Sequence, residues 1–199
     1  MTYLRLDIPF ALAPGVGNDR PMDHPPEHLT HAAVTLRRWR PDDADLSLQL
    51  IRESLEHLRP WMPWATDAYG LADARDYLER CETDWAGGTA FQYLILDNGT
   101  PAGSAGLMAR IGPGGLEIGY WIHPQHIGRG VATAAAAVLT EAAFALPGID
   151  HVEIEHDVLN LASERVPTKL GYCHVQTRRS RFEPDPADSG TSKVWRITR

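Results

Sequence analysis

The chain has 199 residues, which is the size of one globular domain with or without an additional arm. Hydrophobic residues make up 43% of it and charged residues 23%, as in an ordinary soluble globular protein. The formal net charge of −7 at pH 7 argues against a general electrostatic attraction to nucleic acids or anionic membranes.

The two cysteines and the N-terminal region both favour the cytoplasm. Cys81 and Cys173 lie in apolar patterns and form no C-x-x-C motif, so we expect two buried free thiols in a reducing compartment. The sequence contains no run of about 18 apolar residues, and its N-terminus lacks the basic-then-apolar pattern of a signal peptide. We therefore expect a cytoplasmic protein without a membrane segment.

Residues 1–33 are predicted to form a partly irregular arm. Apolar residues alternate over residues 4–10, as in a short half-buried strand, and the prolines and glycines of residues 14–26 then prevent regular structure. The three histidines of residues 24–31 have no cysteine or carboxylate at a defined spacing. We expect these histidines to lie in a solvated loop rather than in a metal site.

Residues 34–88 predict a strand and two helices. The strand covers residues 34–39, and Pro41 with the acidic residues that follow suits the first turn of a helix that continues to Leu58. A second amphipathic helix is predicted over residues 74–85, and Gly87-Gly88 ends it.

The loop between these two helices contains two prolines and two tryptophans within residues 60–64. It is therefore expected to be a rigid aromatic loop. Trp61 and Trp64 either pack into the core or form the wall of a substrate pocket, and the sequence leaves both interpretations open.

The middle of the chain predicts three consecutive antiparallel strands. Residues 91–96 and 102–110 flank Asn98-Gly99, a strong hairpin signal, and the glycine-rich residues 112–115 lead into a third strand over residues 116–122. The first of these strands lacks clean alternation, as expected of a strand that is covered on both faces.

The second half of the chain alternates between helices and strands. An alanine-rich helix is predicted over residues 131–146, a strand over 152–156, a short helix over 160–170, and two strands over 172–182 and 193–198. A strand–helix–strand unit implies a parallel pair joined by a right-handed crossover. The predicted fold class is therefore mixed α/β, with helices flanking a mostly antiparallel sheet.

The turn Gln125–Gly130 is the main functional motif, because it joins a strand directly to the alanine-rich helix. The first backbone N–H groups of a helix lack partners and glycines allow close approach, so such a turn can bind a phosphate group. Its spacing, Q-x-x-G-x-G, matches neither the dinucleotide pattern G-x-G-x-x-G nor the Walker pattern G-x-x-x-x-G-K-S/T. An ordinary strand-to-helix turn is the alternative.

The turn resembles the pyrophosphate loop of the GCN5-related N-acetyltransferases (GNAT), whose pattern is Q/R-x-x-G-x-G/A. Residues 160–172 resemble the N-x-x-S-x-x-V-x-x-K-L-G-F/Y segment of the same superfamily, particularly of its RimJ/RimL-like branch. The GYWIHP, WMPW and VWRITR segments are similar to that branch as well. The resemblance covers about residues 34–199, which would form the acyltransferase domain.

This resemblance implies a sheet that opens into a V between residues 116–122 and 152–156, with a β-bulge at the splay. Pantetheine would occupy the gap and pair with the freed backbone groups as another strand would. The residues that the resemblance assigns to acyl-CoA are Trp121, Ile122 and His123 at the pantetheine and thioester, Gln125, His126, Ile127, Gly128, Arg129, Gly130, Val131, Ala132 and Thr133 around the pyrophosphate, and Asn160 and Ser163 along the pantetheine arm.

The resemblance also implies direct acyl transfer in a ternary complex, without a metal or a covalent enzyme intermediate. The amine must lose a proton, and Glu117 is our candidate base unless it lies at the solvent end of its strand. The backbone N–H of Ile122 is the candidate that stabilises the oxyanion. Many relatives protonate the departing thiolate with a helix tyrosine, but Pro167 takes that position here, so Ser163 is the candidate donor. Pro167 is also expected to shorten or kink the helix.

We therefore predict an N-acyltransferase that moves an acetyl, succinyl or other short acyl group from acyl-CoA to a primary amine of a small molecule or a protein N-terminus. The alternative is a catalytically silent acyl-CoA-binding sensor or assembly module. A dinucleotide-dependent oxidoreductase lacks the acidic ribose ligand at the expected offset. We expect no nucleic-acid or membrane partner, and we keep a homodimer as an expectation for the assembly.

Overall fold

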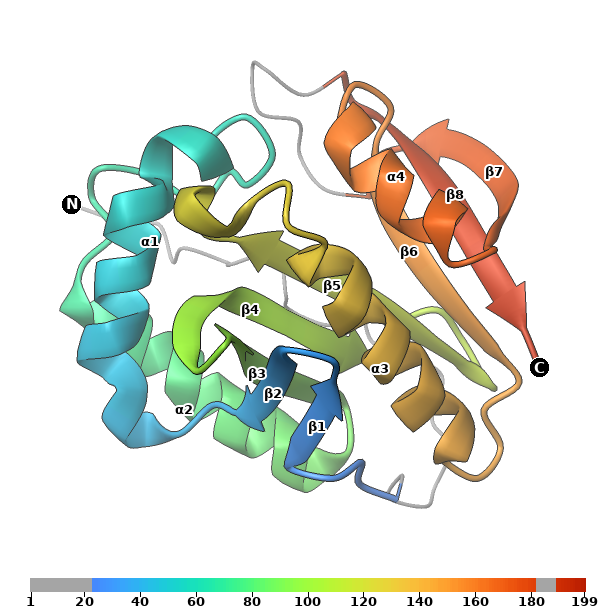
Figure 1. Cartoon of the computed structure of the whole chain (residues 1–199), viewed down its shortest axis with the longest axis horizontal. Coiled ribbons are helices and arrows are strands. Elements are labelled where there is room, and N and C mark those ends of the chain that lie inside the picture. Colours follow the sequence, from blue (N-terminus) through green and yellow to red (C-terminus); the bar gives the residue numbers. More distant parts are fainter. Residues whose placement is uncertain (1–22, 182–188) are drawn as a thin grey trace, which may run out of the picture.

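The structure is a computed structural model that describes residues 23–181 and 189–199 (Figure 1). Its described strands form one sheet with the order β1-β2-β3-β4-β5-β6-β8-β7. Every neighbouring pair in this sheet is antiparallel except β5 and β6, which are parallel. Within the described ranges, no helix is both long and apolar enough to cross a membrane.

The elements from β2 onward confirm the predicted order of strands and helices, with ends that shift by a few residues. The predicted strand over residues 4–10 lies outside the described residues, as does most of the loop that precedes β8. The described elements are β1 (His28–His31), β2 (Val34–Arg38), the 3-10 turn η1 (Pro41–Asp43), α1 (Ala44–Leu58), α2 (Leu71–Gly87), β3 (Ala90–Asp97), β4 (Thr100–Met108), β5 (Gly115–Ile122), the 3-10 turn η2 (Pro124–His126), α3 (Val131–Ala145), β6 (His151–Asp157), α4 (Leu161–Lys169), β7 (Cys173–Arg179) and β8 (Thr191–Thr198).

Strand β1 corrects the prediction of a solvated loop around the histidines. His28 pairs with Arg37 and His31 with Val34, so this segment forms a hairpin on the free edge of β2. Ala32 makes the tight turn with a positive φ of 53°. The histidine side chains are exposed, which is why the residue pattern looks like that of a loop. The division into an arm of residues 1–33 and a domain of residues 34–199 stays a prediction.

The two faces of the sheet are covered by different helices. Alternate residues of a strand point to opposite faces, so β5 sends Ile118 and Ile122 into the core beneath α3, where Ile154 of β6 joins them. The same strand sends Trp121 to the opposite face, where it packs with Leu94 in the core formed by α1 and α2. Figure 1 shows α3 lying across one face of the sheet, with α4 beside β6 and β8.

The sheet opens between its two parallel strands. β5 and β6 pair only from Gly115–His151 to Ile118–Ile154, and beyond that point they diverge into a V (Figure 1). The predicted β-bulge in the splayed strand is wrong, because β5 pairs with β4 in continuous register up to Ile122. Each of the two strands is instead held on its other side by an antiparallel neighbour, and the twist of those two pairs turns the strands apart.

Cysteine burial also differs from the prediction. Cys81 is a buried free thiol on α2, as expected, but Cys173 is a free thiol exposed at the start of β7. β7 is the edge strand of the sheet, and most of its residues are exposed. The apolar pattern around Cys173 therefore does not correspond to a covered strand.

Gly103 of β4 provides a test of how closely β4 and β5 approach beside the V. Its φ is 140°, and an added Cβ would lie 2.2 Å from the carbonyl oxygen of Trp121. We expect Gly103→Ala to lower the free energy of unfolding by about 3 kcal/mol, because backbone strain and a backbone clash act together.

Gly99→Ala is the matched control in this experiment. Gly99 also has a positive φ, of 82°, but a Cβ there would meet no atom within 4 Å. It should cost only about 1 kcal/mol in the same urea titration. Equal losses for the two variants would contradict a tight contact between β4 and β5.

Candidate active site

The turn after β5 has the geometry of an anion site. Gly128 and Gly130 have φ values of 76° and 81°, in the left-handed region, and α3 begins directly after them at Val131. No side chain caps this end of the 15-residue helix. A Cβ at either glycine would meet no atom within 4 Å, so the space above the turn is open to a ligand. These features fit the pyrophosphate of coenzyme A.

Two histidines hold this turn from below. His126 is buried and hydrogen-bonds through Nδ1 to Oδ2 of Asp97 at 2.8 Å, and this bond is the main reason that the pKa of Asp97 is lowered. His123 accepts the backbone N–H of Gln125 at Nδ1, 3.3 Å away, so its Nε2 carries the proton that bonds to Glu53 at 3.1 Å. Both side chains therefore fix the shape of the turn.

The remaining residues predicted for the pyrophosphate lie around the opening of the turn. Gln125, Ile127 and Arg129 are exposed, whereas Val131 is buried in the core below. The side chains of Trp121 and Ile122 are buried in the two opposite cores. Near the V, β5 thus presents its backbone rather than these side chains.

The V itself contains a cleft between β5 and β6. Ile118, Gly119 and Tyr120 line one wall, and residues 155–157 line the other, with Asn160 and Ser163 at the α4 end. The side-chain oxygen of Asn160 accepts the backbone N–H of Ser163 at 3.0 Å, so Asn160 caps α4 and fixes Ser163 at the cleft.

Pro167 leaves Ser163 with a free carbonyl group. A proline has no N–H to donate to the carbonyl four residues earlier. The hydroxyl of Tyr120, on β5, lies 3.3 Å from that carbonyl oxygen and 2.9 Å from Oγ of Ser163. α4 continues to Lys169, so Pro167 does not shorten the helix, and the predicted alternative of a kink stays a prediction. Burial raises the pKa of Tyr120, which keeps its phenol protonated.

Glu117 lies in the cleft wall within an ion-pair network. It is 3% exposed and bonds to Arg110 through one oxygen and to Arg181 through the other. Arg181 also lies 2.5 Å from Glu155, which bonds to Arg178 at 2.7 Å. Burial would raise the pKa of Glu155, but these two arginines outweigh it and the pKa is lowered. Glu117 is thus not at the solvent end of its strand, and each of its oxygens already accepts a guanidinium proton.

His156 also faces the cleft, but it is held as a neutral ring. Trp195 donates its indole N–H to Nε2 at 3.0 Å, and Nδ1 bonds to the carbonyl of Asp157 at 2.8 Å. Burial is the main reason that its pKa is lowered. Both ring nitrogens are therefore occupied. Across residues 23–181 and 189–199, no group of three or more His, Cys, Asp or Glu side chains is arranged to hold a metal ion.

The structure places Trp64 in the core and both tryptophans of the aromatic loop beside the cleft, while their role in substrate binding stays a prediction. Trp64 is 7% exposed and packs beside Tyr69 with ring centroids 5.7 Å apart, as a core residue does. Trp61 is partly exposed. Both line the cleft, so the core and the cleft share this wall.

The sequence did not indicate the contributions of Tyr120, Arg110 and Arg181. Tyr120 reads as an ordinary aromatic residue of a strand, and its partner Ser163 is 43 residues away in the chain. The only available sign was that Pro167 stands where the family resemblance led us to expect a tyrosine. This replacement suggested looking for a hydroxyl group elsewhere near Ser163.

Comparisons with known proteins agree with this geometry. The model of the acetyltransferase (GNAT) domain family matches residues 33–172. YdaF of Bacillus subtilis (strain 168), whose name assigns it to the ribosomal N-acetyltransferases, is 32% identical over 149 residues, which cover 70% of this chain and 77% of YdaF.

Two solved structures show the same fold. RimL, a ribosomal L7/L12 α-N-protein acetyltransferase in complex with coenzyme A, has a TM-score of 0.77 at 20% identity over 86% of this chain and 98% of its own. MccE, a microcin C7 self-immunity acetyltransferase in complex with acetyl-CoA and AMP, has a TM-score of 0.77 at 19% identity over 85% and 94%. The chain therefore belongs to the GNAT acetyltransferase family and is an acyl-CoA-dependent N-acetyltransferase.

Proposed function

We propose that this chain transfers an acetyl group from acetyl-CoA to a primary amine within the cleft between β5 and β6. The observation that carries this proposal is the alignment of three features along one path. The open glycine turn lies at the end of β5, the unpaired edge of β5 follows, and Tyr120 and Ser163 meet across the cleft. A thioester supplies the activated acyl group. The protein positions this group, accepts the proton of the amine and donates a proton to the departing thiolate.

The coenzyme would lie with its pyrophosphate on the turn Gln125–Gly130 and its pantetheine along β5. Residues 119–122 have no β6 partner, so their backbone groups on that side are available to an extended ligand. Asn160 and Ser163 face this path from α4. We assign Trp121, Ile122 and His123 to this contact through their backbone atoms.

Ser163 is our candidate for the donor that protonates the departing thiolate. With its hydroxyl 2.9 Å away, Tyr120 can donate to Oγ of Ser163 and leave the serine proton directed into the cleft. Because Tyr120 remains a neutral phenol, we assign it the role of a positioning residue. Together, Tyr120 and Ser163 would replace the tyrosine hydroxyl that is absent because Pro167 occupies its position in the helix.

The acidic side chains among the described lining residues of the cleft are Glu117, Glu155 and Asp157, and the side chains of the first two are buried in ion pairs. Glu117 stays our candidate for removal of the amine proton, acting through a water molecule, since its two oxygens are already bonded to Arg110 and Arg181. The backbone N–H of Ile122 stays our candidate for stabilising the oxyanion.

We infer that the acceptor is the N-terminal amine of a protein. YdaF and RimL carry names that describe ribosomal-protein acetyltransferases. A peptide N-terminus can enter between Trp61 and Trp64 and place its amine near Gly119, because the tryptophans and this glycine line the same cleft. The free thiols of Cys81 and Cys173 support a reducing, cytoplasmic location. The net charge supports a function without nucleic acid.

A homodimer is also part of this proposal. Val175 is a large apolar residue on the edge strand β7, and it is 49% exposed. An exposed strand edge with an apolar side chain is suited to pairing with a second copy. Light scattering of the purified protein would measure its mass directly.

The central test is turnover with acetyl-CoA. We expect release of free coenzyme A thiol in the presence of peptides with a free N-terminal amine, and none with the same peptides after N-terminal blocking. Calorimetry should show coenzyme A binding in parallel. Binding without turnover on any peptide, polyamine or small amine would overturn the enzyme assignment and favour a silent binding module.

The glycine turn can be tested with a closely matched pair of variants. Gly130 and Gly148 lie at opposite ends of α3, with φ values of 81° and 78° and open space around both. Alanine at either position should cost about 1 kcal/mol of stability. Only Gly130→Ala should weaken coenzyme A binding, by about tenfold or more, because its Cβ enters the anion site. If the two variants bind coenzyme A with equal affinity, the proposal that this turn binds the pyrophosphate is contradicted.

A double-mutant cycle tests Tyr120 and Ser163. We expect Ser163→Ala to lower kcat by about 100-fold and Tyr120→Phe by about tenfold, with unchanged affinity for coenzyme A. Tyr120→Phe should have no further effect in the Ser163→Ala background, because it acts through that hydroxyl.

Tyr172→Phe is the control for this cycle. Tyr172 is 4% exposed, and its hydroxyl lies 2.6 Å from the hydroxyl of Thr140 on α3. These two residues therefore form a similar pair of hydroxyl groups outside the cleft. Tyr172→Phe should change stability but not kcat. Additive effects of Tyr120→Phe and Ser163→Ala would contradict the positioning role.

A further inference from the structure

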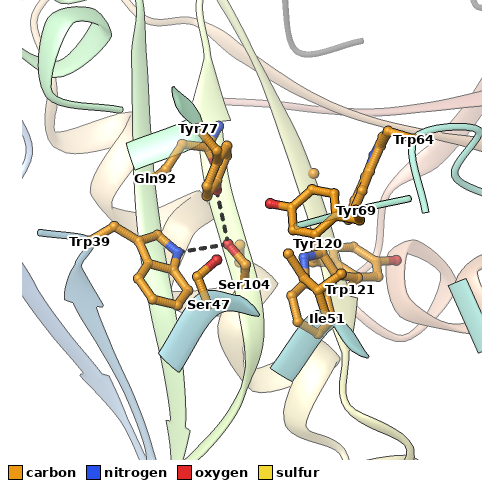
Figure 2. A pocket seen from close by; sticks show the side chains of 12 residues that line it. Trp39, Ser47, Ile51, Trp64, Tyr69, Tyr77, Gln92, Ser104, Tyr120 and Trp121 are labelled. Atoms are coloured by element: carbon orange, nitrogen blue, oxygen red, sulfur yellow. Dashed lines mark hydrogen bonds between the residues drawn. The ribbon is translucent and has the colours of Figure 1, made fainter. Parts of the chain in front are cut away.

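A second cavity lies behind β5, between the sheet and the helices α1 and α2 (Figure 2). It exists because Gly106 of β4 pairs with Gly119 of β5, which leaves a bare strip on this face of the sheet. The side chain of Gln92, the β3 neighbour of Gly106, lies over part of this strip, and its Oε1 would be 2.2 Å from a Cβ on Gly106. The rest of the strip stays empty. We call this cavity the Gln92 pocket.

The Gln92 pocket is uncharged. The described residues that line it include no Asp, Glu, Lys, Arg or His. Ser104 accepts hydrogen bonds from the Trp39 indole at 3.0 Å and from Tyr77 at 3.4 Å, as Figure 2 shows, and it donates to the carbonyl of Tyr93 at 3.1 Å. Its hydroxyl is therefore fully used. A charged group in this pocket would lose its hydration without gaining a partner of opposite charge.

The amide of Gln92 is the exception to this satisfied network. Its side chain is 5% exposed and lines the pocket, and its amide atoms are not among the fully enclosed polar atoms that lack a partner, so they keep contact with the open space of the pocket. A polar amide that faces the open space of an otherwise uncharged pocket can form hydrogen bonds with a ligand or a water there. Gln92 offers both a donor and an acceptor, so its natural partner is a hydroxyl or an amide group.

The pocket lies next to the reaction cleft. Gly119, Tyr120 and Trp64 line both spaces. The cavity volume is ≈ 20 Å³. Because one water needs about 10–15 Å³ on this measure, the pocket has room for a group of about two heavy atoms. A group attached to either reactant near its reacting atom can therefore reach the pocket past Gly119.

We propose that the Gln92 pocket binds a small uncharged group that carries a hydroxyl, supplied by one of the two reactants, and excludes carboxylate and ammonium groups. This inference rests on the proposed function, since it places the reactants at Gly119. This hydroxyl-bearing group can be the side chain of the first residue of the acceptor peptide. It can equally be the part of the acyl chain of the acyl-CoA donor that lies beyond the second carbon. In either case the pocket sets the substrate range, and succinyl transfer through it is excluded.

The test uses two series of substrates with the wild-type protein and Gln92→Leu. The acceptor series consists of peptides that differ only in a first residue of Ser, Ala, Asp or Lys, with acetyl-CoA as the donor. The donor series consists of acetyl-, butyryl-, 3-hydroxybutyryl- and succinyl-CoA with one acceptor peptide. We expect that, in one of the two series, the hydroxyl-bearing substrate has a higher kcat/KM than the apolar and charged substrates.

The Gln92→Leu variant should lose this preference for the hydroxyl-bearing substrate. One neutral hydrogen bond corresponds to about a tenfold effect, so kcat/KM for the hydroxyl-bearing substrate should fall about tenfold, while the apolar substrate changes less than about twofold. Gln176→Leu, an exposed position on β7, is the control and should change neither value. Equal use of charged and neutral members in both series, or the same loss for every substrate in Gln92→Leu, would overturn the proposal.

Pocket occupancy is also measured without turnover. The indole N–H of Trp39 bonds to Ser104 beside the pocket, so its ¹⁵N-resolved NMR signal should shift when coenzyme A and the Ser peptide are added together, or with 3-hydroxybutyryl-CoA. The signal is assigned with Trp39→Phe. If no amine is acetylated but the signal shifts, the pocket proposal stands and the enzymatic assignment fails. A signal unmoved by both probes overturns the pocket.

Discussion

The separation of β5 from β6 beyond Ile118 and Ile154 is the constraint on which the site depends. Hydrogen bonds hold the two strands for four residue pairs, and then each strand follows its antiparallel neighbour. Backbone groups that a continuous sheet would satisfy internally are left for a ligand. The cleft therefore begins where the pairing of these two strands ends.

Charges below the V fix the two strands at this separation. Glu117 of β5 and Glu155 of β6 share Arg181, while Arg110 and Arg178 complete the network from neighbouring segments. Buried carboxylates are costly unless paired, so losing one member would leave another unpaired in the wall of the cleft. The same pairing limits how Glu117 can act as a base. In the proposed mechanism, the same carboxylate would both stabilise the wall of the cleft and accept a proton.

Pro167 links the sequence of α4 to the chemistry of the cleft. A proline inside a helix frees one carbonyl and takes away a side chain that relatives use, and both consequences fall on Ser163. The hydroxyl of Tyr120 lies within reach of both the freed carbonyl and Oγ, and its single proton can be donated to either one of them. The contact with Tyr120 therefore ties α4 to β5 across the cleft, although Pro167 lies in the last turn of this helix.

The sequence by itself determined the order of the elements, the glycine turn before α3, and the family, because these depend on local spacing, turn residues and contiguous motifs. It predicted the helix that carries Ser163 but did not identify Tyr120 as the partner of this serine. Only the tertiary structure decided that Glu117 is clamped by two arginines, that His156 is held neutral, and that Cys173 is exposed. It also revealed the cavity at Gln92. The physical reason is that these properties arise from side chains on different strands and helices, whose contacts are set by sheet order and by the splay, and no periodicity along the chain records either of them.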